Sequence, residues 1–182
     1  MTFLIICFFT ATIILVIFLI QGYKASPINQ VSVTRYLPCP RIIVWEVIGN
    51  IEAMPLRRRD IKKIEVLRHH HDEVTEWIAH TSHGGYLMLK MEYEPYDRLT
   101  MILTASTFGV TGRWDYSFHE CGEGVNLTIE ENSIIPSFWY RIFLCIRGRH
   151  IHLEKEMSSI AYFIKQKKQD GSGPRSAKAM VM

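Results

Sequence analysis

The densest group of potential metal ligands in this 182-residue sequence is the run HHHD at residues 69–72. Consecutive side chains point in different directions in a strand or a turn, so these four neighbours do not converge on one ion. His150 and Glu154 share a helix face at a spacing of four residues, but His152 points elsewhere. We therefore predict no metal site and interpret the histidine run as a solvated turn.

Nucleophilic and cofactor chemistry has no stronger signal. Cys39, Cys121 and Cys145 are scattered, lack metal-ligand spacing and have no obvious histidine partner for nucleophilic catalysis. The glycines at residues 84–85 and 122–124 are typical of hairpin turns and do not form a phosphate-binding loop. We predict no cofactor.

The densest basic cluster comprises Arg57, Arg58, Arg59, Lys62 and Lys63. It is short, and the net charge of the whole chain is only +3, so we predict no nucleic-acid partner. One interpretation of the cluster is a solvated helix face. The other is a membrane-surface patch that attracts anionic lipid headgroups.

The N-terminal segment, residues 3–20, contains no charged side chain. At about 1.5 Å per residue, a helix of this length spans roughly 27 Å, close to the ~30 Å hydrocarbon core of a bilayer. A cleaved signal peptide would have a basic start, a shorter apolar run and a small-residue cleavage site. A buried soluble helix is the third interpretation. We favour an uncleaved, single-pass transmembrane anchor that binds the membrane through residues 3–20.

Flanking charge predicts the orientation of this anchor. Lys24, Arg35 and Arg41 follow the span, whereas only the α-amino group precedes it, so the soluble domain is expected on the cytoplasmic side. The scattered thiols agree, because they do not suggest a disulfide framework. A glycosylation sequon at Asn126 would matter only in an exported domain.

Four regions follow from these boundaries: a transmembrane anchor at residues 1–22, a linker at 23–30, one folded domain at 31–168 and a disordered polar tail at 169–182. The folded part has about 140 residues, the size of one ordinary domain. Nothing in the sequence indicates its oligomeric state.

Seven segments of the domain have strand-like patterns separated by turn signals. They are residues 31–37, 63–68, 74–82, 86–93, 99–105, 110–119 and 125–135. One or two short helices are expected between the first two strands. A long C-terminal helix is expected over residues 137–167, capped by Ser137 and bent near Gly148. This order predicts an α+β domain with a seven-stranded antiparallel sheet.

The alternation within the strands predicts which face of the sheet is buried. In residues 110–119 the even positions are mainly aromatic or apolar and the odd positions polar. Three further strands are assigned in the same way, with Leu87, Leu89, Met91, Tyr93, Leu99, Met101, Leu103, Val125, Leu127 and Ile129 pointing inward. The concave face of the sheet is therefore expected to carry large apolar side chains.

Three stretches resemble one superfamily. They are VTRYLPCPRIIVWEVIGNIEAMP near the start of the domain, Glu76-Trp77 in a middle strand, and GRWDYSFHECGEGVNLTIEENSIIPSFWYRIF before and into the last helix. Together with the element order, they resemble the START-like or Bet v 1-like superfamily, and within it the polyketide cyclase/dehydrase and lipid-transport group. The resemblance covers residues 31–168. The chain departs from it after Pro55, where family members often carry Trp or Tyr and this sequence has Leu56 and three arginines.

The resemblance implies a helix-grip fold, in which the sheet wraps around the long C-terminal helix and leaves a cavity for a hydrophobic molecule. Our candidates for its lining are Trp77, Leu89, Met91, Met101, Leu103, Trp114, Tyr116, Phe118, Leu127, Phe143 and Met157. Methionine and aromatic side chains adapt well to apolar ligands. The same residues would also form a filled core, so both interpretations stay open.

Catalysis would need an acid or a base on the inward face. Only Glu131 and Tyr116 have the required position, and Glu131 can instead lie at the solvated end of its strand or cap the following helix. This scarcity favours a membrane-anchored domain that binds or carries a lipid, an isoprenoid or a polyketide-like molecule. The alternatives are a cyclase or dehydratase that uses Glu131 or Tyr116, and a membrane-tethered interaction module with a filled core.

Overall fold

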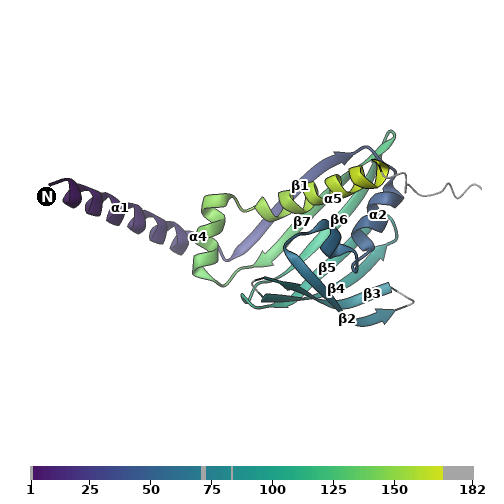
Figure 1. Cartoon of the computed structure of the whole chain (residues 1–182), viewed down its shortest axis with the longest axis horizontal. Coiled ribbons are helices and arrows are strands. Elements are labelled where there is room, and N and C mark those ends of the chain that lie inside the picture. Colours follow the sequence, from purple (N-terminus) through teal and green to yellow (C-terminus); the bar gives the residue numbers. More distant parts are fainter. Residues whose placement is uncertain (1, 71–72, 83, 170–182) are drawn as a thin grey trace, which may run out of the picture.

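The computed structural model describes residues 2–70, 73–82 and 84–169. It begins with helix α1 (Thr2–Lys24), which projects away from the rest of the molecule (Figure 1). Among the described residues, α1 is the one helix that is long and apolar enough to cross a membrane. The predicted tail lies outside the described residues except for Gln169, which ends the last helix.

Seven strands form one antiparallel sheet. They are β1 (Ile28–Leu37), β2 (Ile61–His70), β3 (Glu73–Thr81), β4 (Gly84–Glu94), β5 (Arg98–Ser106), β6 (Thr111–Cys121) and β7 (Gly124–Ile134). The spatial order is β1-β7-β6-β5-β4-β3-β2, so strands two to seven form a meander and β1 joins it beside β7. The predicted α+β architecture is confirmed.

Two short helices, α2 (Arg41–Gly49) and α3 (Met54–Arg57), connect β1 to β2. After β7 the chain forms α4 (Phe138–Arg147) and α5 (Ile151–Gln169). The Ser137 side chain caps α4 by accepting a hydrogen bond from the Tyr140 backbone N–H, as predicted. The expected single helix is two helices, because Gly148 adopts a φ of 92° and turns the chain between them.

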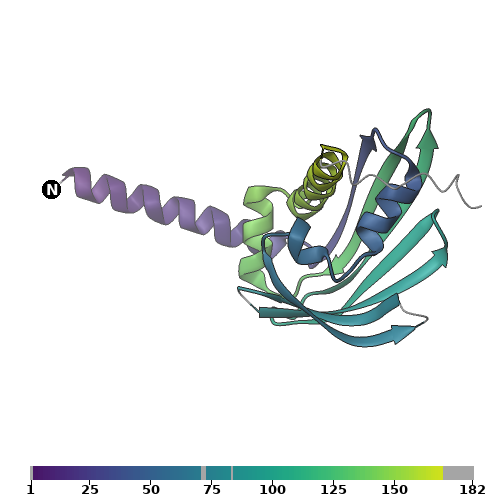
Figure 2. The same ribbon diagram turned by 45° about the vertical axis from the view of Figure 1, so that its right-hand side comes forward.

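The hydrophobic core lies on the concave face of the sheet, beneath α2 and α5 (Figure 2). Helix α5 packs against β1, β7, α2 and α3. Its side chains at intervals of three or four residues, from Leu153 to Ile164, are buried in this layer. The inward assignments for β5, β6 and β7 are confirmed, since their predicted inward residues belong to the core or pack against it.

The face assignment of β4 is wrong. Trp77 and Ala79 of β3 lie directly opposite Met88 and Tyr86, and directly paired residues share a face of the sheet. Met88 and Tyr86 pack against the core, so Leu89 and Leu87 belong to the other face. The run YLML is apolar at every position, so its alternation does not select a face. The side chain of Met91 lies outside the described residues.

Candidate functional site

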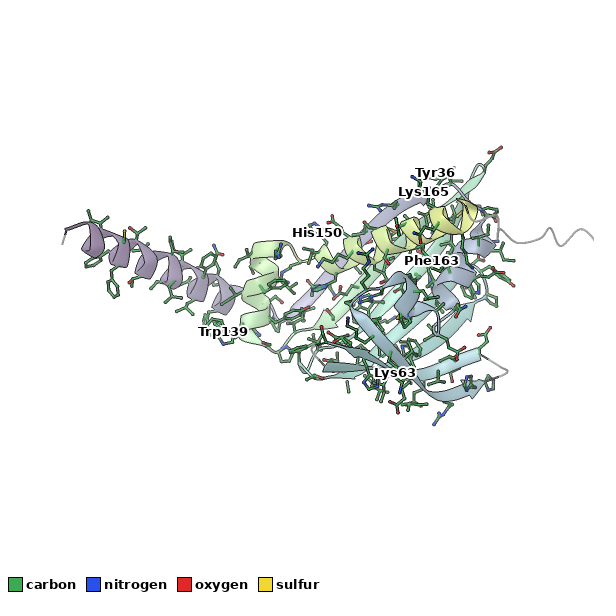
Figure 3. All side chains as sticks on the ribbon, viewed as in Figure 1. Tyr36, Lys63, Trp139, His150, Phe163 and Lys165 are labelled. Carbon is green, nitrogen blue, oxygen red and sulfur yellow. The ribbon has the colours of Figure 1, made fainter. Side chains whose placement is uncertain are left out.

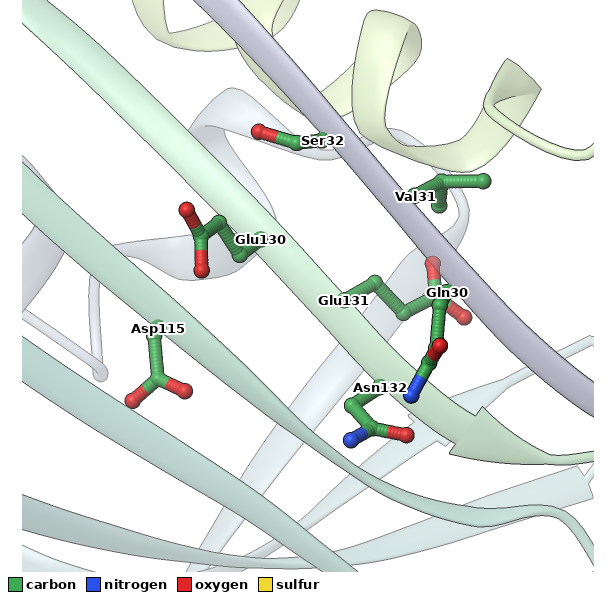
Figure 4. A pocket seen from close by; sticks show the side chains of 7 residues that line it. All are labelled: Gln30, Val31, Ser32, Asp115, Glu130, Glu131 and Asn132. Carbon is green, nitrogen blue, oxygen red and sulfur yellow. The ribbon is translucent and has the colours of Figure 1, made fainter.

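The surface of the described residues includes two hollows near candidate residues. The first, of about 330 Å³, is lined by Gln30, Val31, Ser32, Asp115, Glu130, Glu131 and Asn132 (Figure 4). The second, of about 350 Å³, is lined by Arg41, Glu94, Asp97, Arg98, Ser117, Phe118, His119 and Glu120. Both are open and are lined mainly by polar residue types, and no residue of α5 lines either of them. Their chemistry does not match an apolar ligand.

Hydrogen bonds already engage the carboxylate of Asp115 in the first hollow. Arg113 donates to it from Nε and Nη2 over 2.7 Å each, and Thr100 donates its hydroxyl. Partial burial raises the pKa of this carboxyl. The hydrogen bonds from Arg113 and Thr100 lower the pKa by a larger amount in total, so it lies below its usual value. Asp115 therefore stays ionised and is unsuited to act as a general acid.

Most candidate lining residues lie in the packed interior between α5 and the sheet. Trp77, Met101, Leu103, Tyr116, Phe118, Leu127 and Met157 are buried, and Trp114 is half-buried against them. Phe143 does not lie in this interior, because the turn at Gly148 places it on α4. There its ring stacks on that of Tyr140, with 6.0 Å between the ring centroids. It is 40% exposed and does not line the interior. Leu89 does not line the interior either, because its strand neighbour Met88 pairs with Trp77 and Leu89 therefore points to the opposite face of the sheet.

A charged cluster that we did not predict lies where α3 meets α5. Arg57 is only 7% exposed and Glu156 only 8%. Arg57 Nη1 lies 3.4 Å from Glu156 Oε1, and Arg58 Nη1 lies 3.2 Å from Glu156 Oε2. Arg58 also donates to Asp60 from Nη2 over 2.6 Å. Arg57 is therefore not a solvated or membrane-surface residue, and that assignment is corrected. The membrane-surface role of Arg59, Lys62 and Lys63, which are exposed, stays a prediction.

Several polar atoms in this interior have no hydrogen-bond partner among the described residues. They include Nε and Nη2 of Arg57 and Nε1 of Trp77, whose side chain is completely buried. Buried polar groups are nearly always hydrogen-bonded in folded proteins. The core therefore contains donors able to bind a carbonyl, a hydroxyl or a carboxylate.

Tyr116 faces the same charged cluster from β6. Burial raises the pKa of its phenol well above the ordinary value, and the negative charge of Glu156 adds to this, while the charges of Arg57 and Arg58 oppose it. The phenol is consequently neutral at physiological pH. It can donate a hydrogen bond to a bound molecule, but it is a poor general base.

Glu131 of β7 is buried at 6% exposure, which rules out the solvated strand end considered above. Its Oε1 accepts a hydrogen bond from Ser133 Oγ over 2.5 Å and another from Asn29 Nδ2 over 3.2 Å. Its Oε2 has no partner among the described residues. Trp114 and Val31 lie directly opposite Glu131 on the neighbouring strands. The carboxylate is thus held in place by Ser133 and Asn29, beside the first hollow, with one oxygen available.

A second polar pair links α4 to α5. The Tyr140 hydroxyl lies 2.6 Å from His152 Nε2. Burial raises the pKa of Tyr140 to about 12, with smaller contributions from Tyr86 and Glu131. Burial lowers the pKa of His152, and the positive charges of Lys155 and Arg58 lower it further. Sequence reasoning missed this pair because its two residues come from different helices.

No metal-binding cluster of three or more His, Cys, Asp or Glu side chains occurs in the part of the chain that the structure describes. His69 and His70 end β2 and are exposed. His71 and Asp72 lie outside the described residues. His150 pairs with Glu154 over 3.3 Å on the surface of α5 and its preceding turn.

No family model and no curated protein sequence matches this chain. Solved structures do match it. A START superfamily protein from Mycobacterium smegmatis aligns with a TM-score of 0.65 and 13% identity, over 75% of this chain and 97% of that one. The Zhui aromatase/cyclase from Streptomyces sp. R1128 aligns with a TM-score of 0.66 and 10% identity, over 80% and 99%.

A third solved structure, Ara h 8.0201, aligns with a TM-score of 0.56 and 9% identity, over 76% of this chain and 99% of that one. At such identities the likeness concerns the backbone and does not transfer the chemistry of individual side chains. In the order and pairing of its strands and helices, the chain has the START-like, helix-grip fold.

Proposed function

We propose that this protein is a membrane-anchored START-like domain that binds or carries a hydrophobic ligand between the sheet and α5. The ligand would be a lipid, an isoprenoid or a polyketide-like molecule with one hydrogen-bond-accepting group. The observation that carries the proposal is the buried guanidinium of Arg57, whose Nε and Nη2 have no partner among the described residues.

Energetics favour a ligand at this position. An unsatisfied buried donor costs about 1–3 kcal/mol, so a carbonyl, hydroxyl or carboxylate that accepts from Arg57 would recover this free energy. The surrounding side chains suit the rest of such a molecule, since Met101 and Met157 are flexible and Phe118 is aromatic. A domain that only needed a filled core would gain more from an apolar residue in place of Arg57.

Entry of a ligand requires one element to move, because the core side chains are in contact. The candidate is α3, a single helical turn. It is tied to α5 by the ion pairs of Arg57 and Arg58 with Glu156 and by the hydrogen bond that the Ser159 hydroxyl donates to the Arg57 carbonyl, and its Met54 side chain is buried in the core. Short elements with few contacts open at low free-energy cost. Displacing α3 would expose both Arg57 and the apolar core.

Anchoring through α1 matches this activity. The described side chains of α1 are largely exposed apolar groups, as expected of a helix that faces lipid. A hydrophobic ligand partitions into the membrane, so a tether keeps the domain next to its source. The cytoplasmic orientation belongs to this proposal and rests on the basic residues after α1.

The test is to purify the full chain in detergent, extract its bound molecules and identify them by mass spectrometry. Binding is then measured with a fluorescent fatty acid. Arg57→Met should weaken binding, while Arg59→Met, which changes an exposed arginine in the same segment, should leave it unchanged. Circular dichroism checks that both variants fold. Absence of any co-purified molecule, together with no binding across a panel of lipids and polyketide-like probes, would favour the interaction module instead.

A second candidate function is catalysis, and the geometry of Glu131 is the observation that favours it. A carboxylate fixed by Ser133 and Asn29, with one oxygen available, can exchange a proton with a bound polyketide-like molecule. Glu131→Gln would then abolish the conversion of that polyketide-like molecule, while the fold and the binding of the molecule are preserved. Equal turnover by the two proteins would exclude Glu131 as the catalytic group.

A further inference from the structure

Helix α4 leaves an apolar face uncovered. Trp139 is 68% exposed, Phe143 40% and Ile146 58%. Their spacing of four and three residues places them on one side of the helix. Three large apolar side chains side by side on a ten-residue helix form a patch of the kind that marks an interaction surface. The opposite side of α4 is occupied, since Leu144 is buried and Tyr140 contacts α5.

This helix lies against the C-terminal end of α1. Ile142 and Phe138 of α4 contact Gly22 so closely that a Cβ added at Gly22 would collide with Ile142 Cγ1. Figures 1 and 2 show α4 crossing α1 at a steep angle, at the point where α1 meets the domain. Figure 3 shows Trp139 on the α1 side of α4, away from the sheet. If α1 spans a bilayer, α4 lies along its surface.

The connection between α1 and the domain is short and held in place. Only residues 25–27 separate α1 from β1. Arg149, in the turn between α4 and α5, donates to the Ile28 carbonyl over 2.9 Å and to the Ser26 carbonyl over 3.2 Å. The Ile135 N–H donates to the Pro27 carbonyl over 2.7 Å. These contacts restrict the domain from swinging about the anchor, so the exposed face of α4 stays on the side of α1.

The residues around this junction are those that prefer a membrane interface. Tyr23, at the end of α1, is highly exposed, and Trp139 lies on the neighbouring helix. Tyrosine and tryptophan concentrate at the level of lipid headgroups. Lys24 and Arg147 supply positive charge at the ends of the two helices, where lipid phosphates would lie.

We propose that α4 is a second membrane contact, which lies in the headgroup region of the bilayer that α1 crosses and inserts Trp139, Phe143 and Ile146 among the lipids. This inference rests on the membrane anchoring in the proposed function and extends it, because it sets the orientation of the whole domain. The occupant is lipid, since α4 packs against α1 and both helices carry exposed large apolar side chains.

The contact would also place the interior next to the bilayer. Tyr140, on the domain side of α4, bonds to His152 of α5, the helix that closes over the core. A movement of α4 in the headgroup region would therefore be transmitted to the start of α5. Lipid docking and access to the interior would share one element.

The experiment uses the full chain reconstituted in phosphatidylcholine and phosphatidylglycerol vesicles that carry bromine on the upper acyl chain, which quenches nearby tryptophan. Trp45 and Trp77 are buried and Trp114 is half-buried, so Trp139 is the exposed tryptophan. We expect lipid quenching in the unmodified protein and loss of most of it in Trp139→Phe. For comparison, Lys63→Trp in the Trp139→Phe protein adds an exposed tryptophan away from α1 (Figure 3). The α4 contact predicts no quenching at this position, whereas the membrane-surface role predicted for Lys63 from the sequence predicts quenching.

Each contrary result identifies what is wrong. If the protein does not float with the vesicles, the anchor and the α4 contact both fail. If it floats but Trp139→Phe leaves quenching unchanged, the anchor stands and the α4 contact is overturned. Quenching at Lys63→Trp would show that the basic segment faces the bilayer instead, which also overturns it. Cross-linking of two copies through an unquenched α4 would assign the face to a dimer. Failure of ligand binding with quenching intact would overturn only the ligand proposal.

Discussion

Arg57 and Glu156 form a buried ion pair, and two further charged groups, Arg58 and Asp60, belong to the same cluster. The Glu156 carboxylate is shared with Arg58, and Arg58 is paired in turn with Asp60. Burial lowers the pKa of Arg58, but Glu156 and Asp60 outweigh it and raise that pKa, so the guanidinium stays charged. Removing one member of such a group leaves an uncompensated charge in a poorly solvated place.

Glu156→Leu is therefore expected to destabilise the protein by about 3–5 kcal/mol, because it leaves Arg57 buried without a carboxylate. Glu154→Leu, on the same helix but exposed, is expected to change stability by less than about 0.5 kcal/mol. The measurement is the thermal unfolding temperature of the unmodified protein and of the two variants, as full chains in the same detergent. Similar unfolding temperatures for the two variants would contradict the ion-pair account.

His152 makes the stability of the domain depend on pH. Burial lowers its pKa below 6.5 in the folded protein, so the unfolded chain binds a proton more readily. The contribution of His152 is complete above about pH 6.5 and declines as the pH falls below that value. We expect the unfolding temperature to drop between pH 7 and pH 5, and less so in His152→Gln. The exposed His150→Gln serves as control, and an equal reduction in both variants would refute the assignment.

At the scale of elements, the packing of α4 on α1 depends on one glycine. Gly22 permits Ile142 and Phe138 to approach the α1 backbone, and any larger residue must push them away. The same contact fixes the angle at which the exposed face of α4 is presented. The orientation of the domain relative to α1 thus depends on the contact of Gly22 with Ile142 and Phe138.

Gly22→Leu is expected to loosen α4 by about 1–3 kcal/mol through overpacking. Amide hydrogen exchange in α4, measured on the full chain in lipid nanodiscs, should become faster. Adding Ile142→Ala should restore part of the protection, because it makes room for the new side chain. Unchanged exchange in the single variant would show that α1 and α4 do not pack together in a bilayer.

The elements also show which structural features sequence patterns can predict. In β6 the alternation of aromatic and polar residues predicted the buried face correctly, because one side of the strand faces the core and the other faces water. In β4 the run YLML is apolar on both sides, so the face was decided by pairing with Trp77 and Ala79. The C-terminal helical stripe was recognised, but the turn at Gly148 was expected as a bend and separates two helices.

At the scale of the whole molecule, α1 extends from one end of a domain whose core lies between the sheet and α5 (Figure 1). With α4 at the same end, Trp139 and Tyr23 lie on the side of the molecule that we propose faces the membrane. The opposite end contains the turn between β6 and β7, where Cys121 is exposed. This polarity makes topology measurable without adding a tag.

Cys121 should react with a membrane-impermeant maleimide only when the cytoplasmic side is accessible. We expect labelling in inverted vesicles or permeabilised cells and none in intact cells, since the basic residues after α1 favour the cytoplasm. Cys121→Ser identifies the signal from this position, because Cys145 on α4 is also exposed. Labelling of Cys121 in intact cells would reverse the orientation.

By itself, the sequence determined the apolar N-terminal span, the succession of strands along the chain and the inward faces of β5, β6 and β7. These are properties of neighbours along the chain, where periodicity and charge act within a few residues. Only the tertiary structure decided that Arg57 is buried, that Glu131 is held by Asn29, and that α4 lies against α1. The partners in these contacts are far apart in the sequence, with a separation of 102 residues between Asn29 and Glu131. Their environment depends on which surfaces meet on folding, and no local pattern encodes that.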